Sequence, residues 1–594
     1  MSFEALSRLL ELTHQIIISP YFLLTLACWI TYVYSLKTGF VSDDLAGICD
    51  FDGHLQTSYK DEAERLERRK WPFFKRLMHT EYGMFMRWLR FHIAGGSFPS
   101  KARFTKPDGT QGDPIPTGKT PRRHHVISIT IFNIVVLLGY AFLSKLFGPK
   151  LAMMTMILLI VHPVTTQGVA WISGLGYPLS LVWMFAILNL VHWHYTLPTH
   201  STIESVIVYG VFGLLYFLAV NALFVALCLW PILIYFGWYP FGIIGMVVSA
   251  YLGMKIVRET IVYRKDEFKK QNMEHTVYPK ARKIIVALKT ILYYLKMTFW
   301  PDKLGLYHKW GSVYDHSVER EDKMFLGGLI ASILLALGAY YGPPEIRFGI
   351  FWFVAFIFIF LNWITIQQFV TERYLMIPAI GLYLVVSYFI QDHMVIYALI
   401  IGLLLMRTWM HLPTYDNELR FYLSNTWNFQ DSEIAYNNLG CTWVRLGWTQ
   451  SGIDTWTMAQ KINPNYDVTF YNVASHFISN GRVNMEHGNY AQALEMFKVG
   501  LDKLNSAINV ERCHFKEMWT KERDEIQQYV MNPVSMVLKE KSRIGELKTK
   551  LQIEFDSANL PQRKLEINQS INDCEQRLSH IEQLIIQNAK PPQA

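Results

Sequence analysis

The sequence has 594 residues, a formal net charge of +8, and 51% hydrophobic against 18% charged residues. An average soluble chain is about 25% charged, so this composition argues against the three or four soluble domains that the length would allow. The hydrophobic content excludes disorder over the whole length, and six Cys in so long a chain exclude a disulfide-built scaffold. The composition therefore indicates a membrane protein, or a soluble part joined to a membrane part.

Charge is divided unevenly along the chain. Residues 1–412 carry 37 Lys and Arg against 26 Asp and Glu, whereas residues 413–594 carry 19 against 22. The first part is apolar and basic, and the second is hydrophilic and mildly acidic. We therefore expect an all-α protein in which a transmembrane domain at 1–412 precedes a soluble helical part.

Eleven apolar runs in the first part are long enough to cross a bilayer, which takes about 20 residues. They lie near 16–36, 126–147, 150–170, 177–197, 203–219, 221–237, 239–256, 325–342, 348–368, 374–390 and 393–410. The run at 16–36 is too long for a cleaved signal peptide. Asn221 and Pro231 suggest a break between two closely joined helices.

An odd number of spans puts the two ends of the chain on opposite sides of the membrane. We expect a cytoplasmic N-terminus and an extracytoplasmic C-terminal part, in a bacterial inner membrane or an endoplasmic reticulum membrane. Most of the basic residues then fall in two long loops, 38–124 and 257–322. Basic loops beside a membrane favour anionic lipid over nucleic acid as the partner.

The first of these loops contains a helical pattern. Between Phe74 and His92, apolar residues recur at helical spacing with bases between them. This pattern is typical of an amphipathic helix in the membrane interface, and the same stripe would also suit a helix packed on the bundle. Residues 95–123 are rich in Gly, Pro, Lys and Arg, and indicate an irregular loop.

The C-terminal part begins with a repeat. The segment NNLGCTWVRLGWTQSGIDTWTMAQKINP around Leu439 has the spacing of small and large residues found in a tetratricopeptide repeat, a helix pair of 34 residues. An irregular second copy extends the TPR-like region to 413–504, and residues 505–594, broken at Pro533 and Pro561, form a helical cap.

Two interpretations of this part stay open. It either packs on the membrane part or binds another protein, either an acceptor or a partner. The residues expected to make the second kind of contact are Asn438, Trp443, Tyr471 and Asn472.

Two adjacent carboxylates, Asp43 and Asp44, directly follow the first span. They could act as a general base or hold a divalent cation, although a solvated turn is the plainer interpretation. No Cys/His spacing resembles a metal site, so a metal has no support beyond this pair.

Other polar residues stand at the ends of later spans. His162, Lys296, Lys303 and Arg373 all fall on the same side as Asp43 and Asp44 when the spans are counted. Arg and Lys at such positions suit a phosphate group. The alternative for Arg373 is an ion pair with Glu372 or another carboxylate that anchors a helix end.

Five of these segments occur together in a recognisable order. They are FVSDD, HPVTTQGVAWISG, YLKMTFWPDKLGL, TERYLMIPAIG and a repeat that starts AYNNLG. The pattern resembles the TMTC proteins, the transmembrane and tetratricopeptide repeat-containing O-mannosyltransferases, and covers most of residues 30–470.

This resemblance implies a GT-C helix bundle whose active site opens on the extracytoplasmic face. Such enzymes transfer a sugar from a polyprenyl-phosphate carrier to an acceptor, which here would be a protein, for example through a Ser or Thr hydroxyl, or another acceptor. It also implies that Asp43 or Asp44 is the catalytic base. Arg373, Lys303, Lys296 and His162 would then bind the donor and its phosphate.

Three sites depart from the family pattern, because Gln167, Tyr177 and Asn221 stand where TMTC-like sequences tend to carry charged residues. A second hypothesis follows from these departures. The chain would be a catalytically inactive GT-C-like scaffold that recruits protein partners through its TPR-like part.

Overall fold

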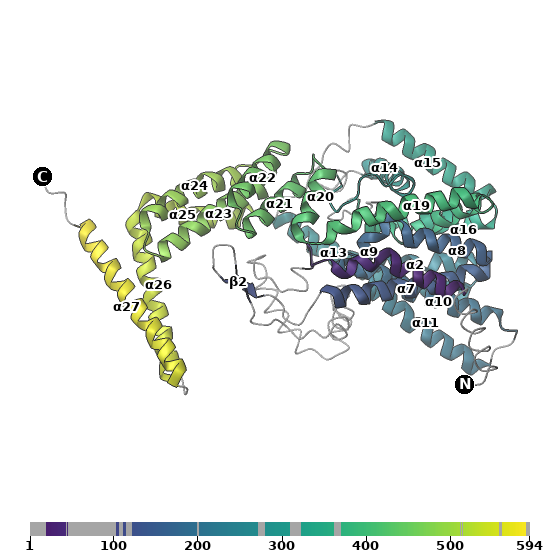
Figure 1. The fold of residues 1–594 in the computed structure, drawn as a ribbon, viewed down its shortest axis with the longest axis horizontal. Coiled ribbons are helices and arrows are strands. Elements are labelled where there is room, and N and C mark those ends of the chain that lie inside the picture. Colours follow the sequence, from purple (N-terminus) through teal and green to yellow (C-terminus); the bar gives the residue numbers. More distant parts are fainter. Residues whose placement is uncertain are drawn as a thin grey trace, which may run out of the picture. The chain divides into compact units, whose positions relative to one another are not determined.

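The computed structural model is helical over most of its length (Figure 1). The structure describes residues 19–42, 44, 103–105, 111–114, 121–198, 201–270, 280–308, 322–361, 370–510, 513, 515–557 and 561–589. The expected amphipathic helix at 74–92 and Asp43 lie outside these residues. Two short strands, β1 (Arg103–Thr105) and β2 (Gln111–Pro114), pair antiparallel within the segment expected to be irregular.

The chain divides into two compact units. The first comprises residues 1–262 and 276–447, and the second comprises residues 263–275 and 448–594. The division thus follows Gly447, whereas the charge pattern suggested a boundary near residue 412. Residues 413–447 belong to the first unit because their side chains bind its turns. Asn425 and Asn428, for example, bind the backbone of residues 304–307.

The first unit contains the apolar helices. They are α2 (Pro20–Tyr32), α7 (Pro121–Phe147), α8 (Pro149–Val161), α9 (Thr166–Val169), α10 (Gly176–Thr196), α11 (Thr202–Ala222), α12 (Trp230–Tyr235), α13 (Tyr239–Lys270), α14 (Lys280–Phe299), α15 (Asp322–Tyr341), α16 (Pro344–Ile357), α17 (Glu372–Leu375), α18 (Ala379–Ile390) and α19 (Met394–His411). The helices α20 (Glu418–Asn428) and α21 (Glu433–Arg445) follow. Short 3-10 turns join several of them: η1 (Val33–Lys37), η2 (Pro163–Thr165), η3 (Ile172–Leu175), η4 (Phe224–Cys228), η8 (Phe358–Phe360) and η9 (Leu412–Tyr415).

Within the described residues, five helices are long and apolar enough to cross a membrane. They are α7, α10 with the turn before it, α11, α15, and α19 with the turn after it. A sixth results if α8 and the segment Pro163–Val169, which is bent by 60° from it, count as one span. Most of the other expected runs form shorter apolar helices. The structure is thus consistent with a membrane protein, while eleven spans stay a prediction.

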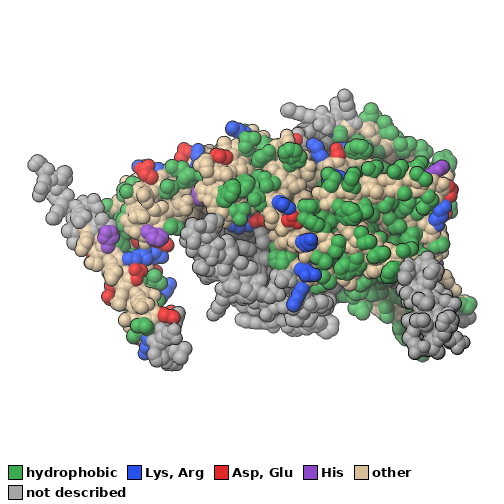
Figure 2. Space-filling model, in the orientation of Figure 1, with side chains coloured by type: hydrophobic (Ala, Val, Ile, Leu, Met, Phe, Trp, Pro, Cys, Tyr) green, Lys and Arg blue, Asp and Glu red, His purple; other side chains and the backbone are tan. Residues whose placement is uncertain are grey.

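Apolar side chains cover the outside of the first unit. Figure 2 shows hydrophobic side chains over much of its visible face. Leu334 on α15 and Leu403 on α19 are each 62% exposed. Soluble proteins rarely expose large contiguous apolar patches. This surface therefore fits lipid better than water.

Most of the described residues of the expected basic loop 257–322 are helical. The helix α13 continues to Lys270, and α14 begins at Lys280. Apolar residues at helical spacing bury one side of α14, where Tyr294 and Met297 are buried. The helix packs closely on α15, because a Cβ at Gly328 would lie 2.2 Å from the carbonyl oxygen of Leu288.

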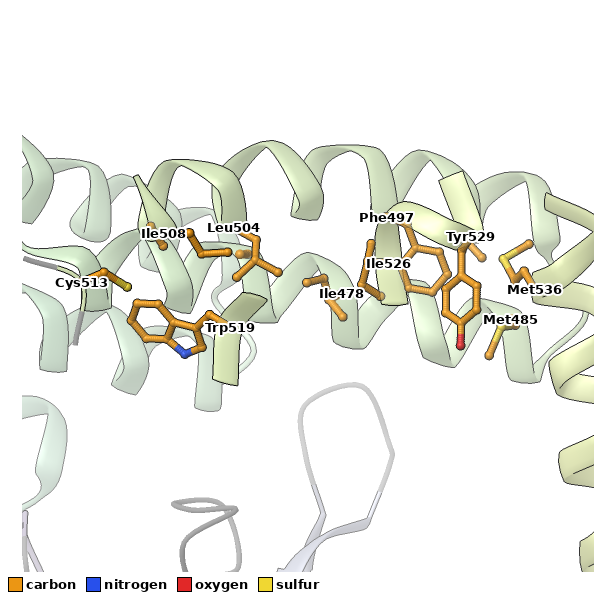
Figure 3. Close-up of a cluster of buried hydrophobic side chains, with 13 residues drawn as sticks. Ile478, Met485, Phe497, Leu504, Ile508, Cys513, Trp519, Ile526, Tyr529 and Met536 are labelled. Carbon is orange, nitrogen blue, oxygen red and sulfur yellow. The ribbon is translucent and has the colours of Figure 1, made fainter. Parts of the chain in front are cut away.

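The second unit contains α22 (Thr449–Ile462), α23 (Asp467–Glu486), α24 (Tyr490–Ile508), α25 (Lys516–Met531), α26 (Pro533–Ser557) and α27 (Pro561–Ala589). Its core runs between α23, α24 and α25 and is closed at one end by Met536 of α26 (Figure 3). Gly481 lets α23 approach α24, since a Cβ there would lie 2.6 Å from the ring of Phe497. The last two helices begin at Pro533 and Pro561, the positions where the sequence suggested breaks.

A buried carboxylate on α26 links three helices in the second unit. Glu540 on α26 is 1% exposed and accepts from Arg543 Nε (2.7 Å) and Arg577 NH2 (3.0 Å). Arg577 also donates to the backbone carbonyl of Glu486 at the end of α23. These bonds compensate the buried charge and fix the α26–α27 hairpin to the end of α23.

The two expected repeats differ in outcome. The second expected pair, α23 and α24, packs side by side as a helical hairpin (Figure 1). The first expected pair is α21 and α22, and these helices belong to different compact units. Within its own unit α21 packs on α20, and α22 packs on α23. The TPR-like arrangement therefore stays a prediction.

Candidate functional site

Asp44 lies at the end of a turn that follows η1. Its carboxylate is fully buried, and Oδ1 accepts hydrogen bonds from the backbone N–H (2.7 Å) and the hydroxyl (2.6 Å) of Ser173. Oδ2 accepts from the N–H of Val41 (3.2 Å). Ser42 has a φ of 53°, in the left-handed region, which closes the turn. Asp44 thus ties residues 41–44 to the turn before α10.

The guanidinium group of Arg373, on α17, stacks on the same turn before α10. The indole N–H of Trp171 donates to the carbonyl of Val41 (3.2 Å). The Cζ atom of Arg373 lies 5.1 Å from the ring centroid of Trp171 and 5.3 Å from that of Tyr374. Stacking on aromatic faces holds a guanidinium through cation–π attraction. Residues 171–173 therefore contact both Asp44 and Arg373, which are far apart in the sequence.

Two of the three neutral residues at which the resemblance would imply a charge have local explanations. Tyr177 is buried, and its ring centroid lies 6.4 Å from that of Tyr374, so it adds an aromatic wall beside Arg373. Asn221 donates from Nδ2 to the carbonyl of Phe217 one turn earlier on α11 (2.9 Å). Neither side chain replaces the charge that the family pattern implies.

Gln167, the third such site, links three segments. Its Oε1 accepts from the hydroxyl of Thr371 (2.9 Å) and from the N–H of Arg373 (3.2 Å). Its Nε2 donates to the carbonyl of Gly305 (3.0 Å). The side chain is 1% exposed, so these bonds satisfy an amide that water does not reach. A carboxylate could accept the first two bonds but could not make the third.

Beside Arg373, the carboxylate of Glu372 faces two histidines. Oε1 lies 3.6 Å from Nε2 of His308, and Oε2 lies 3.7 Å from Nε2 of His411. Oε1 also accepts a hydrogen bond from the N–H of Gly305. All three side chains are buried, Glu372 completely. This Glu372 cluster (Glu372, His308 and His411) provides a partner for Glu372 other than Arg373, the ion pair that the sequence left open.

The environment of Glu372 favours its ionised form. Burial by itself would raise the pKa of this carboxyl group, but the imidazole N–H groups of His308 and His411 more than offset burial. The pKa of Glu372 is therefore below its ordinary value of 4.5. At neutral pH the carboxylate of Glu372 is therefore ionised although it is buried.

The turn at 304–308 is fixed from two sides. Opposite Glu372, the Oδ1 atom of Asn425 on α20 accepts from the N–H of Leu306 (2.7 Å). Asn428 Nδ2 donates to the carbonyl of Leu304 (2.7 Å). Gly305 has a φ of 158°, and a Cβ there would lie 2.6 Å from Asn425 Oδ1, so no larger residue fits.

His162 stabilises a turn. Its Nδ1 accepts from the N–H of Val164 (3.3 Å), and its Nε2 lies 2.9 Å from the carbonyl oxygen of Thr298. An imidazole that accepts at one nitrogen and donates at the other is neutral. Both ring nitrogens thus contact the backbone, and phosphate binding by His162 stays a prediction.

Lys296 and Lys303 lie on the exposed turn that ends α14. The Nζ of Lys296 pairs with Asp302 (3.1 Å), and the N–H of Lys303 donates to the same carboxylate (2.9 Å). Arg407 on α19 donates to the carbonyls of Pro301 (3.2 Å) and Asp302 (2.9 Å). The two lysines therefore belong to a surface turn, whereas Arg373 belongs to the half-buried stack on Trp171.

The four residues expected to contact an acceptor or partner fall in both units. In the first, Asn438 donates to the hydroxyl of Tyr307 (2.7 Å), and Trp443 is half-buried. In the second, Tyr471 stacks on Trp519 with centroids 4.5 Å apart, and Asn472 is half-buried on the same helix. Burial and the nearby Glu522 carboxylate raise the pKa of Tyr471 to about 12. Tyr471 is thus partly a core residue.

Sequence reasoning missed most of the Glu372 cluster. His308 lies just after the segment YLKMTFWPDKLGL, and His411 follows the last apolar run, but neither histidine was predicted as a site residue, and Glu372 entered only as a partner for Arg373. The available signal was position, because Glu372 and His411 adjoin the ends of apolar runs, whereas His308 lies within the expected loop 257–322. Among the described residues, no group of three or more His, Cys, Asp or Glu has a metal-binding arrangement.

The contacts show what these residues can do together. A buried carboxylate, Asp44, and a guanidinium, Arg373, contact one short segment at the common end of several helices. A second carboxylate, Glu372, lies directly before Arg373 and holds the 304–308 turn. Such a set can take a proton and hold a phosphate. No family model, curated protein or solved structure matches this chain.

Proposed function

We propose that the protein is a membrane glycosyltransferase that moves a sugar from a polyprenyl-phosphate carrier to a protein hydroxyl on the extracytoplasmic face. The observation that carries this proposal is the meeting of Asp44 and Arg373 on residues 171–173. A general base and a phosphate-binding group are the two parts that such a reaction needs. The resemblance to the TMTC proteins supports the same reaction class.

The proposed chemistry assigns one role to each group. The carboxylate of Asp44, or of Asp43, removes the proton of a Ser or Thr hydroxyl as its oxygen attacks the anomeric carbon. The bond from that carbon to the phosphate oxygen breaks, and the polyprenyl phosphate leaves with the negative charge. Arg373 stabilises this charge, because a guanidinium fork matches two phosphate oxygens. The lipid tail of the carrier stays in the bilayer.

Asp44→Asn is expected to lower sugar transfer by about 10²–10⁴-fold, which is the typical contribution of general base catalysis. The measurement is transfer from a polyprenyl-phosphate mannose donor to a Ser/Thr peptide by the purified protein. Asp43→Asn is measured beside it, since either carboxylate is a candidate.

The control is Asp392→Asn, which removes an exposed carboxylate that pairs with Lys150. It is expected to leave transfer unchanged. If both site variants fold as the parent does and transfer sugar at the parent rate, the proposed base is wrong.

A second candidate function is an inactive scaffold, and two observations favour it. Asp44 already accepts three hydrogen bonds, and Gln167 is a structural link where the family pattern implies an acid. In this case the second unit, through its TPR-like helices, binds a protein partner.

Removal of residues 448–594 separates the two functions. For a scaffold, this truncation is expected to abolish a complex isolated with the full-length protein, while Asp44→Asn leaves the complex intact. For a transferase with its site in the first unit, the truncated protein keeps transfer to a short peptide. Co-purification and the transfer assay together measure both outcomes.

A further inference from the structure

The turn that ends α14 displays two aromatic rings to the outside. Phe299 is 60% exposed and Trp300 is 69% exposed. Large exposed aromatic residues at the end of a helix are costly in water. Tryptophan is enriched at membrane–water interfaces, where its ring meets lipid and its N–H meets polar groups.

This turn is rigid. The N–H of Trp300 donates to the carbonyl of Lys296 (2.7 Å), and the N–H of Asp302 donates to the carbonyl of Trp300 (2.9 Å). Arg407 of α19 holds the carbonyls of Pro301 and Asp302. The exposed rings are therefore presented by a fixed backbone.

Next to the turn, α19 carries a lipid-facing stripe. Leu399, Leu403, Met406 and Met410 recur at intervals of three or four residues, which places them on one face of the helix. Each of them is more than half exposed. Near the C-terminal end of α19, Arg407 interrupts the apolar face and donates hydrogen bonds to the backbone of the turn at Pro301 and Asp302. The contact places Phe299 and Trp300 at the level where the apolar stripe ends.

Basic groups surround the same place. Lys296, Lys303 and Arg407 contribute three positive charges. The carboxylate of Asp302 pairs with Lys296, and the buried carboxylate of Glu372 also attracts Arg407, which leaves a surplus of about one positive charge. Lys296 is half exposed in its ion pair with Asp302, and Lys303 is exposed. An apolar surface, two interfacial rings and a surplus of positive charge thus coincide.

We propose that the turn Phe299–Lys303, together with Arg407, binds the phosphate headgroup of an anionic bilayer phospholipid and anchors this end of the protein at the membrane surface. The rings of Phe299 and Trp300 lie among the upper acyl chains, and the ammonium and guanidinium groups bind the phosphate. In this assignment Lys296 and Lys303 bind the headgroup of a bilayer phospholipid, and Arg373 binds the phosphate of the sugar donor. It depends on membrane placement and not on sugar transfer.

Photocrosslinking of the full-length protein tests the proposal. Trp300→Bpa (p-benzoyl-phenylalanine) is reconstituted in vesicles of equimolar phosphatidylglycerol and phosphatidylcholine and irradiated. Mass spectrometry is expected to find lipid adducts with phosphatidylglycerol in excess. Lys303→Gln in the same background is expected to lower that excess about fivefold, the contribution of one basic residue at an anionic surface.

The matched control is Trp427→Bpa, at another exposed tryptophan, on α20 (79% exposed), that should give no lipid adduct. Absence of lipid adducts at position 300 overturns the proposal, as does an equal yield with the two phospholipids. Polyprenyl phosphate is added in a further arm. Its preferential capture would make the turn a donor site and also overturn the assignment. Each result is independent of the transfer assay.

Discussion

Glu372→Gln is expected to destabilise the first unit by about 1–3 kcal/mol, as the loss of a partner for buried polar groups does. The carboxylate is completely buried between His308 and His411 and also accepts from the N–H of Gly305. A Gln side chain has one acceptor where the carboxylate has two. Its NH2 group would face an imidazole N–H.

The effect can be located as well as measured. Thermal unfolding of the purified protein should show a lower melting temperature. Hydrogen exchange should show faster exchange in residues 304–308, because Glu372 holds their backbone. Glu546→Gln, at an exposed position of α26, is the control and should change neither quantity. An unchanged melting temperature in Glu372→Gln would mean that the cluster does not hold the fold.

The same carboxylate predicts a pH dependence. Because the pKa of Glu372 is lower in the folded protein than its ordinary 4.5, the unfolded state binds more protons in the acid range. The contribution of Glu372 to stability is therefore complete above the unfolded pKa, and it is lost as the pH falls through the folded pKa. The parent should lose stability below about pH 4.5, and Glu372→Gln should show a smaller loss over that range.

The sequence indicated which segments form the candidate site better than it indicated which side chains pair within it. Apolar runs mark helix ends, and counting them put Asp44, His162 and Arg373 on one side, where contacts do join their segments. The partners of Glu372 could not be predicted, because His308 and His411 come from segments that meet only in the folded chain. Pairing of buried groups is a tertiary property that hydrophobic periodicity does not carry.

The domain boundary shows a similar limit. The charge pattern changes near residue 412, where the apolar helices end. The compact unit continues to Gly447, because α20 supplies Asn425 and Asn428 to the 304–308 turn. Composition thus marks the end of the lipid-facing surface, whereas side-chain hydrogen bonds decide where the folded unit ends. The boundary after Gly447 also assigns α21 and its expected repeat partner α22 to different compact units.

Gln167→Glu restores the kind of residue that the family resemblance implies, and it is expected to destabilise the first unit by about 2–4 kcal/mol. The new carboxylate would keep the bonds from Thr371 and Arg373. It would also place an oxygen where Nε2 now donates to the carbonyl of Gly305 (3.0 Å). The Glu372 carboxylate already lies on the N–H side of Gly305. Two negative groups would then share one buried turn.

A proton would relieve this repulsion, since the new carboxyl group, once protonated, can donate to the carbonyl of Gly305 as the amide of Gln167 does. The folded state should therefore raise the pKa of the carboxyl group that Gln167→Glu introduces. The loss of stability should be complete at neutral pH and shrink as the pH falls toward the unfolded pKa of about 4.3. Melting temperatures at neutral and acid pH measure this change, with the exposed substitution Gln492→Glu on α24 as the control.

The result bears on whether the chain is catalytic. If Gln167→Glu is unstable at neutral pH, the neutral side chain of Gln167 is needed to hold the 304–308 turn. The departure from the pattern that the resemblance implies is then a structural adaptation. A stable Gln167→Glu variant that gains sugar transfer would show instead that the parent has lost a catalytic acid. The inactive scaffold would then be the better description of the natural protein, and Asp44 would act in it as the link between residues 41–44 and Ser173.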